Sequence, residues 1–219
     1  MTRRALLFDL DGCLVDSTRA ITTCINLALD GVGLPVRDPA ELVRFIGPPL
    51  PESFATLLDE SGADARLVAD CVTRYRVAYP EVSLRSTEVV PGIEPALAAL
   101  SAEAVLAVVT SKPREFAVPI VEHLGLAPWF VAVHGPVTDL QGEPKAATLR
   151  RALDTIGPGL ELGHVVMIGD REHDVAAGIA CGVRTVGVTW GAGDRAELEA
   201  AGADHVVASP AELVALLGR

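Results

Sequence analysis

A short apolar run near the N-terminus ends in two aspartates and a glycine, and it constrains the fold more than any other stretch. The run from Ala5 to Leu10 has the length and composition of a buried strand, and Asp9, Asp11 and Gly12 close it. A strand that ends in acids exposes them at the carboxyl edge of a sheet, where open α/β folds place their chemistry. Side chains two positions apart leave a strand on the same face, so we expect Asp9 and Asp11 to address one ligand together.

The two carboxylates of this run stand close enough to interact. Like charges at this spacing raise the pKa of one of them unless a cation intervenes. Such a pair suits one acid as nucleophile or metal ligand and the other as proton carrier. A pair of solvated acids at a strand end is the alternative that the run by itself leaves open.

The order of helical and strand patterns indicates the architecture. Helical patterns alone fill the stretch from about residue 38 to residue 79, whereas helices and strands alternate from residue 91 onward. Such alternation predicts a mostly parallel sheet covered on both faces. We therefore predict an α/β fold, with a Rossmann-like parallel sheet in a core domain of residues 1–15 and 85–219 and an all-helical cap domain inserted over residues 16–84. The elements expected after the cap are helices 93–100, 114–124, 145–156 and 173–181 and strands 105–109, 131–133, 165–168, 185–188 and 205–207.

Charge and composition exclude several classes of partner. A formal net charge of −11 argues against nucleic acid or an anionic membrane surface. No segment approaches the roughly 18 apolar residues of a membrane span, and the first apolar run is too short for a signal peptide. The four cysteines have neither paired nor zinc-site spacing, which is typical of buried thiols in a reducing compartment, so we expect a cytoplasmic protein.

Lysine is rare in this sequence. Of 18 basic residues only Lys112 and Lys145 are lysines. Lysine is a compact point charge suited to a single phosphate oxygen, and an anionic substrate of so acidic a chain needs local cations or a metal. Lys145 opens a predicted helix beside the other polar strand ends, while Lys112 is expected to be a peripheral cation.

Polar residues also follow two later strands of the predicted sheet. Thr110, Ser111 and Lys112 follow strand 105–109, and Asp170 and Asp174 follow strand 165–168. The carboxyl ends of parallel strands share one edge, so we expect these residues to converge on one cleft with the two acids of the first strand. Taken singly, Thr110 could be an ordinary helix cap, and the later acids could merely favour a helix N-terminus.

Together these segments resemble the haloacid dehalogenase superfamily, and within it the phosphoglycolate phosphatase-like branch with a helical cap. The resemblance covers essentially the whole chain. Its motifs are Phe8-Asp-Leu-Asp-Gly-Cys-Leu-Val-Asp-Ser17, Val109-Thr-Ser-Lys-Pro113, Lys145, Ile168-Gly-Asp-Arg-Glu-His-Asp174, Phe45-Ile-Gly-Pro-Pro-Leu50 and Trp190-Gly-Ala-Gly.

The resemblance implies roles for the acids. Asp9 would be the nucleophile that forms an aspartyl-phosphate. Asp11 would protonate the leaving alkoxide and then activate water. Mg²⁺ would be held by Asp9, the backbone carbonyl of Asp11 and Asp170, since hard oxygen ligands around a phosphate-bridging ion fit magnesium better than zinc.

The remaining site residues are implied in the same way. Thr110 and Lys145 would bind the transferring oxygens, and Lys145 would also restrain the nucleophile. Backbone N–H groups near Gly12 and Ser111 would add donors to the substrate. Asp174 would orient the metal waters or Lys145 from one helical turn beyond the metal ligand.

The cap and three departures from the family pattern bear on the substrate. Arg44 is the cap arginine that we expect to face the substrate anion. Cys13 stands where threonine is usual, Lys145 lacks its usual proline context, and Arg171 replaces a small polar residue. These departures leave every implied catalytic group in place and concern the identity of the substrate alone.

The sequence therefore predicts a Mg²⁺-dependent phosphatase that acts on a small phosphorylated metabolite as a monomer or homodimer. 2-Phosphoglycolate is the first candidate, followed by nucleoside 5'-monophosphates and sugar phosphates. A phosphomutase of the same superfamily, which passes the phosphoryl group to a sugar hydroxyl, is the close alternative. A phospho-acceptor module similar to a response-regulator receiver and a non-catalytic binding protein are the distant ones.

Overall fold

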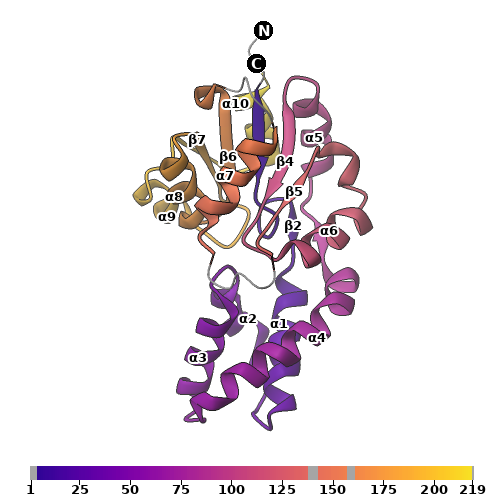
Figure 1. The fold of residues 1–219 in the computed structure, drawn as a ribbon, viewed down its shortest axis with the longest axis vertical. Coiled ribbons are helices and arrows are strands. Elements are labelled where there is room, and N and C mark those ends of the chain that lie inside the picture. Colours follow the sequence, from indigo (N-terminus) through magenta and orange to yellow (C-terminus); the bar gives the residue numbers. More distant parts are fainter. Residues whose placement is uncertain (1–3, 138–142, 157–160, 219) are drawn as a thin grey trace. The chain divides into compact units, whose positions relative to one another are not determined.

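The computed structural model describes residues 4–137, 143–156 and 161–218, and the chain divides into two compact units (Figure 1). One unit comprises Met1–Asp16 and Glu88–Arg219 and contains a six-stranded sheet, and we call it the α/β unit. The other comprises Ser17–Thr87, and we call it the helical unit. Among the described residues, no helix combines the length and the apolar character that crossing a membrane requires.

The sheet is parallel throughout, in the order β5-β4-β1-β6-β7-β8. The central strand β1 pairs with β4 and β6 in such a register that Phe8 lies opposite both Val108 and Ile168. The three strands thus end at nearly the same level, and the segments that follow them begin at one edge. The strands are β1 (Ala5–Phe8), β4 (Val105–Val109), β5 (Val133–His134), β6 (Val165–Gly169), β7 (Arg184–Val188) and β8 (His205–Val207).

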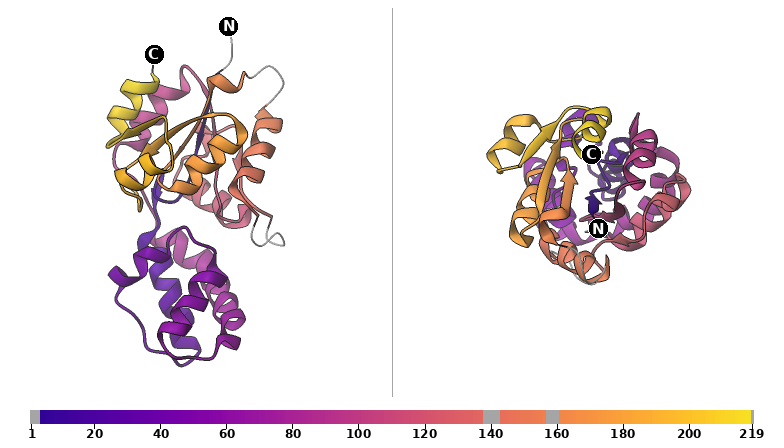
Figure 2. Two further views of the ribbon diagram at one scale, coloured as in Figure 1. Left: turned by 90° about the vertical axis from the view of Figure 1, so that its left-hand side faces the viewer. Right: turned by 90° about the horizontal axis from the view of Figure 1, so that it is seen from above.

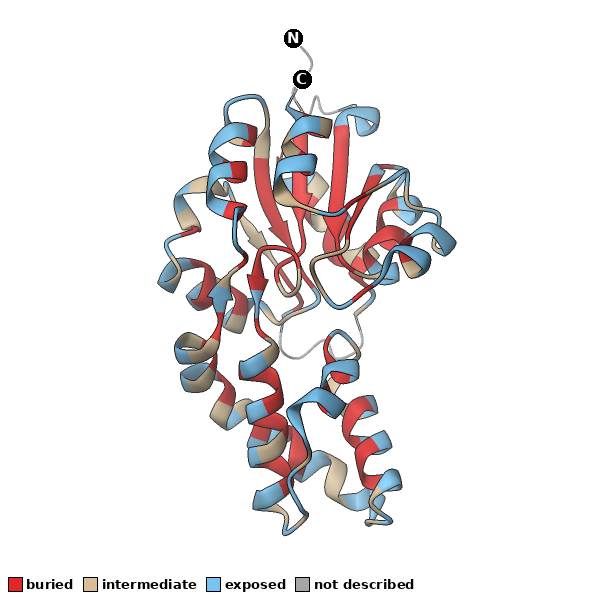
Figure 3. Cartoon of the chain, turned by 180° about the vertical axis from the view of Figure 1, so that it is seen from behind, coloured by how far each residue is buried: buried red, intermediate tan, exposed pale blue. Residues whose placement is uncertain are grey.

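Helices cover both faces of this sheet (Figure 2). Side chains alternate along β1, so that Leu6 and Phe8 enter one apolar cluster and Ala5 and Leu7 enter the other. The centre of the sheet is accordingly buried on both sides (Figure 3). The first cluster includes residues of α5 (Ile93–Ser101), α6 (Arg114–His123) and α10 (Pro210–Leu217), and the second includes residues of α7 (Lys145–Ile156) and α8 (Glu172–Cys181).

The helical unit has its own buried side chains. Tyr75 and Tyr79 stack with ring centroids 5.2 Å apart, and Phe54 meets Tyr75 edge-on at 6.3 Å. These three rings are buried, which gives the unit an aromatic core in a chain with few aromatic residues. Its helices are α1 (Thr18–Gly31), α2 (Pro39–Leu42), α3 (Leu50–Glu60) and α4 (Val68–Ser86), with short 3₁₀ turns at Val43–Phe45 and Ala65–Leu67.

A small antiparallel pair lies where the chain leaves and re-enters the α/β unit. Strand β2 (Val15–Asp16) pairs with β3 (Glu88–Val89), and neither was expected from the sequence. Strand β1, at the N-terminus, is also shorter than the predicted strand of residues 5–10. Its chain turns because the carbonyl of Leu10 accepts the N–H groups of Leu14 and Val15, each at 3.0 Å.

Candidate active site

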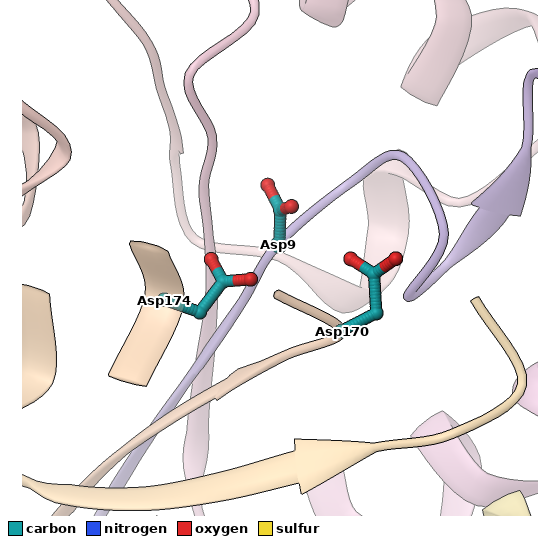
Figure 4. A group of neighbouring side chains, drawn as sticks. All are labelled: Asp9, Asp170 and Asp174. Carbon is teal, nitrogen blue, oxygen red and sulfur yellow. The ribbon is translucent and has the colours of Figure 1, made fainter. Parts of the chain in front are cut away.

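Three carboxylates gather at the carboxyl edge of the sheet (Figure 4). Asp9 follows β1, Asp170 follows β6, and Asp174 lies in the first turn of α8. Each offers an oxygen that lies within 4.8 Å of the oxygens of the other two. All three residues are buried, so their mutual repulsion must be offset by a cation or by protons.

Lys145 supplies one such cation from the first residue of α7. Its Nζ lies 2.8 Å from Oδ1 of Asp9 and also forms an ion pair with Asp174. Burial by itself would lower the pKa of Lys145, but the carboxylates of Asp174 and Asp9 together raise it above its ordinary value. Lys145 is therefore a fixed ammonium group that bridges the two acids.

One ammonium group does not balance three buried carboxylates. Burial raises the pKa of Asp9 to about 6, although Lys145 acts in the opposite direction. Burial, and then the charges of Asp9 and Asp174, raise the pKa of Asp170 to about 7. Without a further cation the cluster retains protons near neutral pH, and a divalent ion would favour its ionised form.

The residues of the cluster fit a magnesium ion. Oδ2 of Asp170 accepts a hydrogen bond from the Ala192 N–H at 2.7 Å, whereas Oδ1 is buried and accepts none from the described residues. Gly12 has φ +79°, and a Cβ at that position would collide with the Asp170 carboxylate. The close backbone and the buried carboxylate oxygen, in a donor set of oxygens alone, match a small hard cation.

Asp11 is paired with the second lysine. Nζ of Lys112 lies 2.6 Å from Oδ1 of Asp11, and the two side chains are 7% and 17% exposed. The expectation that Lys112 is a peripheral cation is therefore wrong. The rarity of lysine in the sequence was the available signal, and it applied to both lysines.

The turn after β4 contributes Thr110 and Ser111. Thr110 is buried, its N–H donates to the carbonyl of His134 at 3.0 Å, and its Oγ1 accepts from the Lys112 N–H at 3.1 Å. Ser111 is exposed. The Gly12 N–H donates to the carbonyl of Val15 at 2.8 Å. The absence of a side chain at Gly12 leaves room for the Asp170 carboxylate.

Arg44 belongs to the helical unit. Its guanidinium donates to both oxygens of Glu60 at 2.7 Å and lies 4.5 Å from the ring centroid of Phe45. The side chain is 55% exposed, and its charge is already paired within the unit. A contact between Arg44 and a substrate remains a prediction.

The sequence analysis named the Trp190-Gly-Ala-Gly segment after β7 only as a motif, and it assigned neither this segment nor Glu197 a role near Asp170. Ala192 donates to its carboxylate, and Trp190 donates from Nε1 to the carbonyl of Cys13 at 2.9 Å. Glu197 accepts from Arg171, the neighbour of Asp170, at 2.8 Å. The glycines on both sides of Ala192 were the visible signal, since they permit a close approach of backbone to a side chain.

Comparison with known proteins identifies the family of the chain. The sequence matches the haloacid dehalogenase-like hydrolase family over residues 6–188. It is 36% identical over 209 residues to a 5'-nucleotidase of Pseudomonas aeruginosa, with 95% of this chain and 92% of the relative covered. It is 33% identical over 226 residues to a phosphoglycolate phosphatase of Chromobacterium violaceum, with 98% and 96% covered.

A solved structure shows the same fold. The Mycobacterium tuberculosis Protein Tyrosine Kinase A (PtkA) matches with a TM-score of 0.84 at 32% identity, covering 100% of this chain and 99% of that one. The family match spans most of the chain, and both curated relatives are covered almost completely. The chain therefore belongs to the haloacid dehalogenase-like hydrolase family, in its phosphoglycolate phosphatase-like branch, and is a phosphoric monoester hydrolase.

Proposed function

We propose that this protein is a Mg²⁺-dependent phosphatase that hydrolyses small phosphomonoesters through an aspartyl-phosphate on Asp9. The observation that carries the proposal is the buried ion pair of Asp9 with Lys145, set among two further carboxylates at the edge of the sheet. Lys145 orients the Asp9 carboxylate and favours its ionised form, which is the form that a nucleophile requires.

The metal ligands in this proposal are the carboxylates of Asp9 and Asp170 and the backbone carbonyl of Asp11. When bound, the ion neutralises the phosphoryl oxygens and lets an anionic nucleophile approach an anionic substrate. Asp174 stays outside this set because its carboxylate is occupied by Lys145 and by the Arg171 N–H at 3.0 Å.

The first half of the reaction transfers the phosphoryl group to the protein. A carboxylate oxygen of Asp9 attacks phosphorus in line with the ester oxygen, so that a P–O bond to Asp9 forms while the ester P–O bond breaks. The leaving alkoxide takes a proton from the Asp11 carboxyl group. Lys145 and Thr110 bind the transferring oxygens, where their donors offset the charge that develops on them.

The second half returns the protein to its starting state. Asp11, now ionised, takes a proton from a water molecule as that water attacks the phosphorus of the aspartyl-phosphate. The bond between phosphorus and Asp9 breaks, inorganic phosphate leaves, and Asp11 is again protonated. Lys112 orients the Asp11 side chain in both steps.

Two substrate classes come first. 2-Phosphoglycolate follows from the branch to which the chain belongs, and nucleoside 5'-monophosphates follow from the name of the Pseudomonas aeruginosa relative. Transfer to a sugar hydroxyl in place of water would make the protein a phosphomutase that uses the same residues in the first half-reaction.

Phosphate release from these substrates, measured with and without Mg²⁺ in the wild type and in Asp9→Asn, tests the proposal. We expect Mg²⁺-dependent release that the variant lacks, with both proteins unfolding at similar temperatures. Retained turnover in Asp9→Asn would overturn the nucleophile assignment. Phosphorylation of Asp9 in the wild type, seen by mass spectrometry without release of free phosphate, would favour the mutase.

A further inference from the structure

The backbone of the loop that follows β7 is hydrogen-bonded to the Asp170 carboxylate. The Ala192 N–H donates to Oδ2 at 2.7 Å, which leaves the buried Oδ1 as the second oxygen of this acid. The glycines on either side pack so closely that a Cβ at Gly191 would collide with the Asp170 carboxylate and one at Gly193 with the Asp170 carbonyl. The loop thus fixes which oxygen of Asp170 the site can use.

The helix that follows this loop contacts the two residues that come directly after Asp170 in the chain. Glu197, in α9 (Arg195–Ala200), accepts through Oε1 from Arg171 Nε at 2.8 Å and from the Glu172 N–H at 2.9 Å. Its own N–H is capped by Asp194 at 2.8 Å. Both residues that directly follow Asp170 are therefore tied to one carboxylate oxygen, 26 and 25 positions further along the chain.

We propose that Arg171 and Glu197 are positioning residues for metal binding, because they hold the turn that carries Asp170 in the geometry that presents Oδ1 to the ion. The inference rests on the proposed magnesium site. Neither side chain is a ligand in it. Groups that orient a metal ligand typically contribute about 10- to 100-fold to metal affinity, and this is the range expected here.

The sign of the effect at Arg171 separates positioning from simple electrostatics. The Arg171 guanidinium is a positive charge beside a site for a cation, so its charge alone disfavours Mg²⁺. If charge were all that mattered, Arg171→Gln would bind Mg²⁺ more tightly than the wild type. Positioning predicts the opposite, because the variant loses the ion pair that ties the turn to α9.

The experiment measures Mg²⁺ binding to the whole protein by isothermal titration calorimetry without substrate, so that catalysis does not enter the readout. The variants are Arg171→Gln, Glu197→Ala and Glu197→Gln. Arg195→Gln and Glu199→Gln are matched controls, since they remove the same charges from an exposed ion pair of α9 whose Nη1 and Oε1 atoms lie 3.2 Å apart. Asp170→Asn tests the metal site itself.

We expect Arg171→Gln and Glu197→Ala to weaken Mg²⁺ binding by about tenfold or more. Glu197→Gln, which retains the acceptor oxygen, should lose less, and the controls should stay within about twofold. Unchanged or tighter binding in Arg171→Gln, with Asp170→Asn abolishing binding, would overturn the inference and leave the proposed function intact. Unchanged binding in Asp170→Asn would instead overturn the magnesium site. If Glu197→Ala does not fold, Arg171→Gln and Glu197→Gln still decide the outcome.

Discussion

Lys112 Nζ lies 2.6 Å from Oδ1 of Asp11, and both side chains are largely buried. The other lysine of the chain, Lys145, pairs in the same way with Asp9 at 2.8 Å. Each acid of the Asp9-Leu-Asp11 segment thus has its own ammonium partner. The nucleophile and the proton carrier of the proposed reaction are oriented separately, by residues from different segments of the α/β unit.

Lys112 should therefore contribute to turnover, although the sequence pattern predicted a peripheral cation. We expect Lys112→Met to lower kcat for phosphate release by about 10- to 100-fold, since a general acid that loses its orientation loses part of its contribution. Arg114→Met is a suitable control, because this exposed cation of the same segment bonds to the carbonyl of Val133 at 3.2 Å. An unchanged kcat in Lys112→Met would show that Asp11 needs no such partner.

Gly12 and Gly33 offer a matched pair for testing the close approach to Asp170. Both have φ +79°, but a Cβ at Gly33 meets nothing within 4 Å, whereas one at Gly12 meets the Asp170 carboxylate. Gly33→Ala should therefore cost only backbone strain, about 1 kcal/mol. Gly12→Ala should also displace a metal ligand and abolish Mg²⁺-dependent activity in a folded protein. Steady-state assays and thermal unfolding of both variants measure these effects, and comparable activities would contradict the packing argument.

Lys145 should be a large contributor to stability in the metal-free protein. Removing one partner from a buried ion pair leaves uncompensated charge, so Lys145→Met should lose about 3–5 kcal/mol of unfolding free energy at pH 8 in the presence of EDTA. Mg²⁺ should restore part of this loss, because it replaces the missing cation. Urea unfolding with and without Mg²⁺ measures both effects. Arg150→Met, an exposed residue of the same helix, should change stability little.

The raised pKa values of Asp9 and Asp170 give a pH dependence of stability with a definite sign. Their values of about 6 and about 7, against 3.8 in an unfolded chain, mean that the native state binds more protons between about pH 4 and pH 7. The metal-free protein should therefore become less stable as pH rises through this window. Thermal unfolding in EDTA from pH 4.5 to 8 should show this fall, and Asp170→Asn should reduce it. A midpoint that rises across the window in EDTA would contradict it.

Helices α9 and α10 were not expected from the sequence, although each has a local start signal that hydrophobic periodicity does not use. Ser209 precedes helix α10 as its N-cap. Its hydroxyl accepts the Glu212 N–H at 3.2 Å, and this Ser-x-x-Glu pattern is a helix start signal. Helix α9 begins in the same way after Asp194. The pair β2 and β3 has no comparable signal, because each strand has two residues and its partner lies more than seventy positions away.

The sequence by itself determined the parallel α/β fold and the family. Alternating helix and strand patterns require parallel strands, and parallel strands bring their carboxyl ends together. Asp9, Asp170 and Asp174 could be placed at one edge for that reason, and Lys145 was expected beside the nucleophile, as the resemblance implied. The structure has all four residues in direct proximity.

Only the tertiary structure decided how these groups are held. The contact of Lys112 with Asp11 joins residues 101 positions apart, and that of Glu197 with Arg171 joins residues 26 positions apart. Neither pair follows from strand order, because a long side chain can reach several neighbours and its choice depends on packing and burial around it. The sequence specifies which chemical groups stand at the edge of the sheet, and the packing of loops and helices against that edge determines their partners.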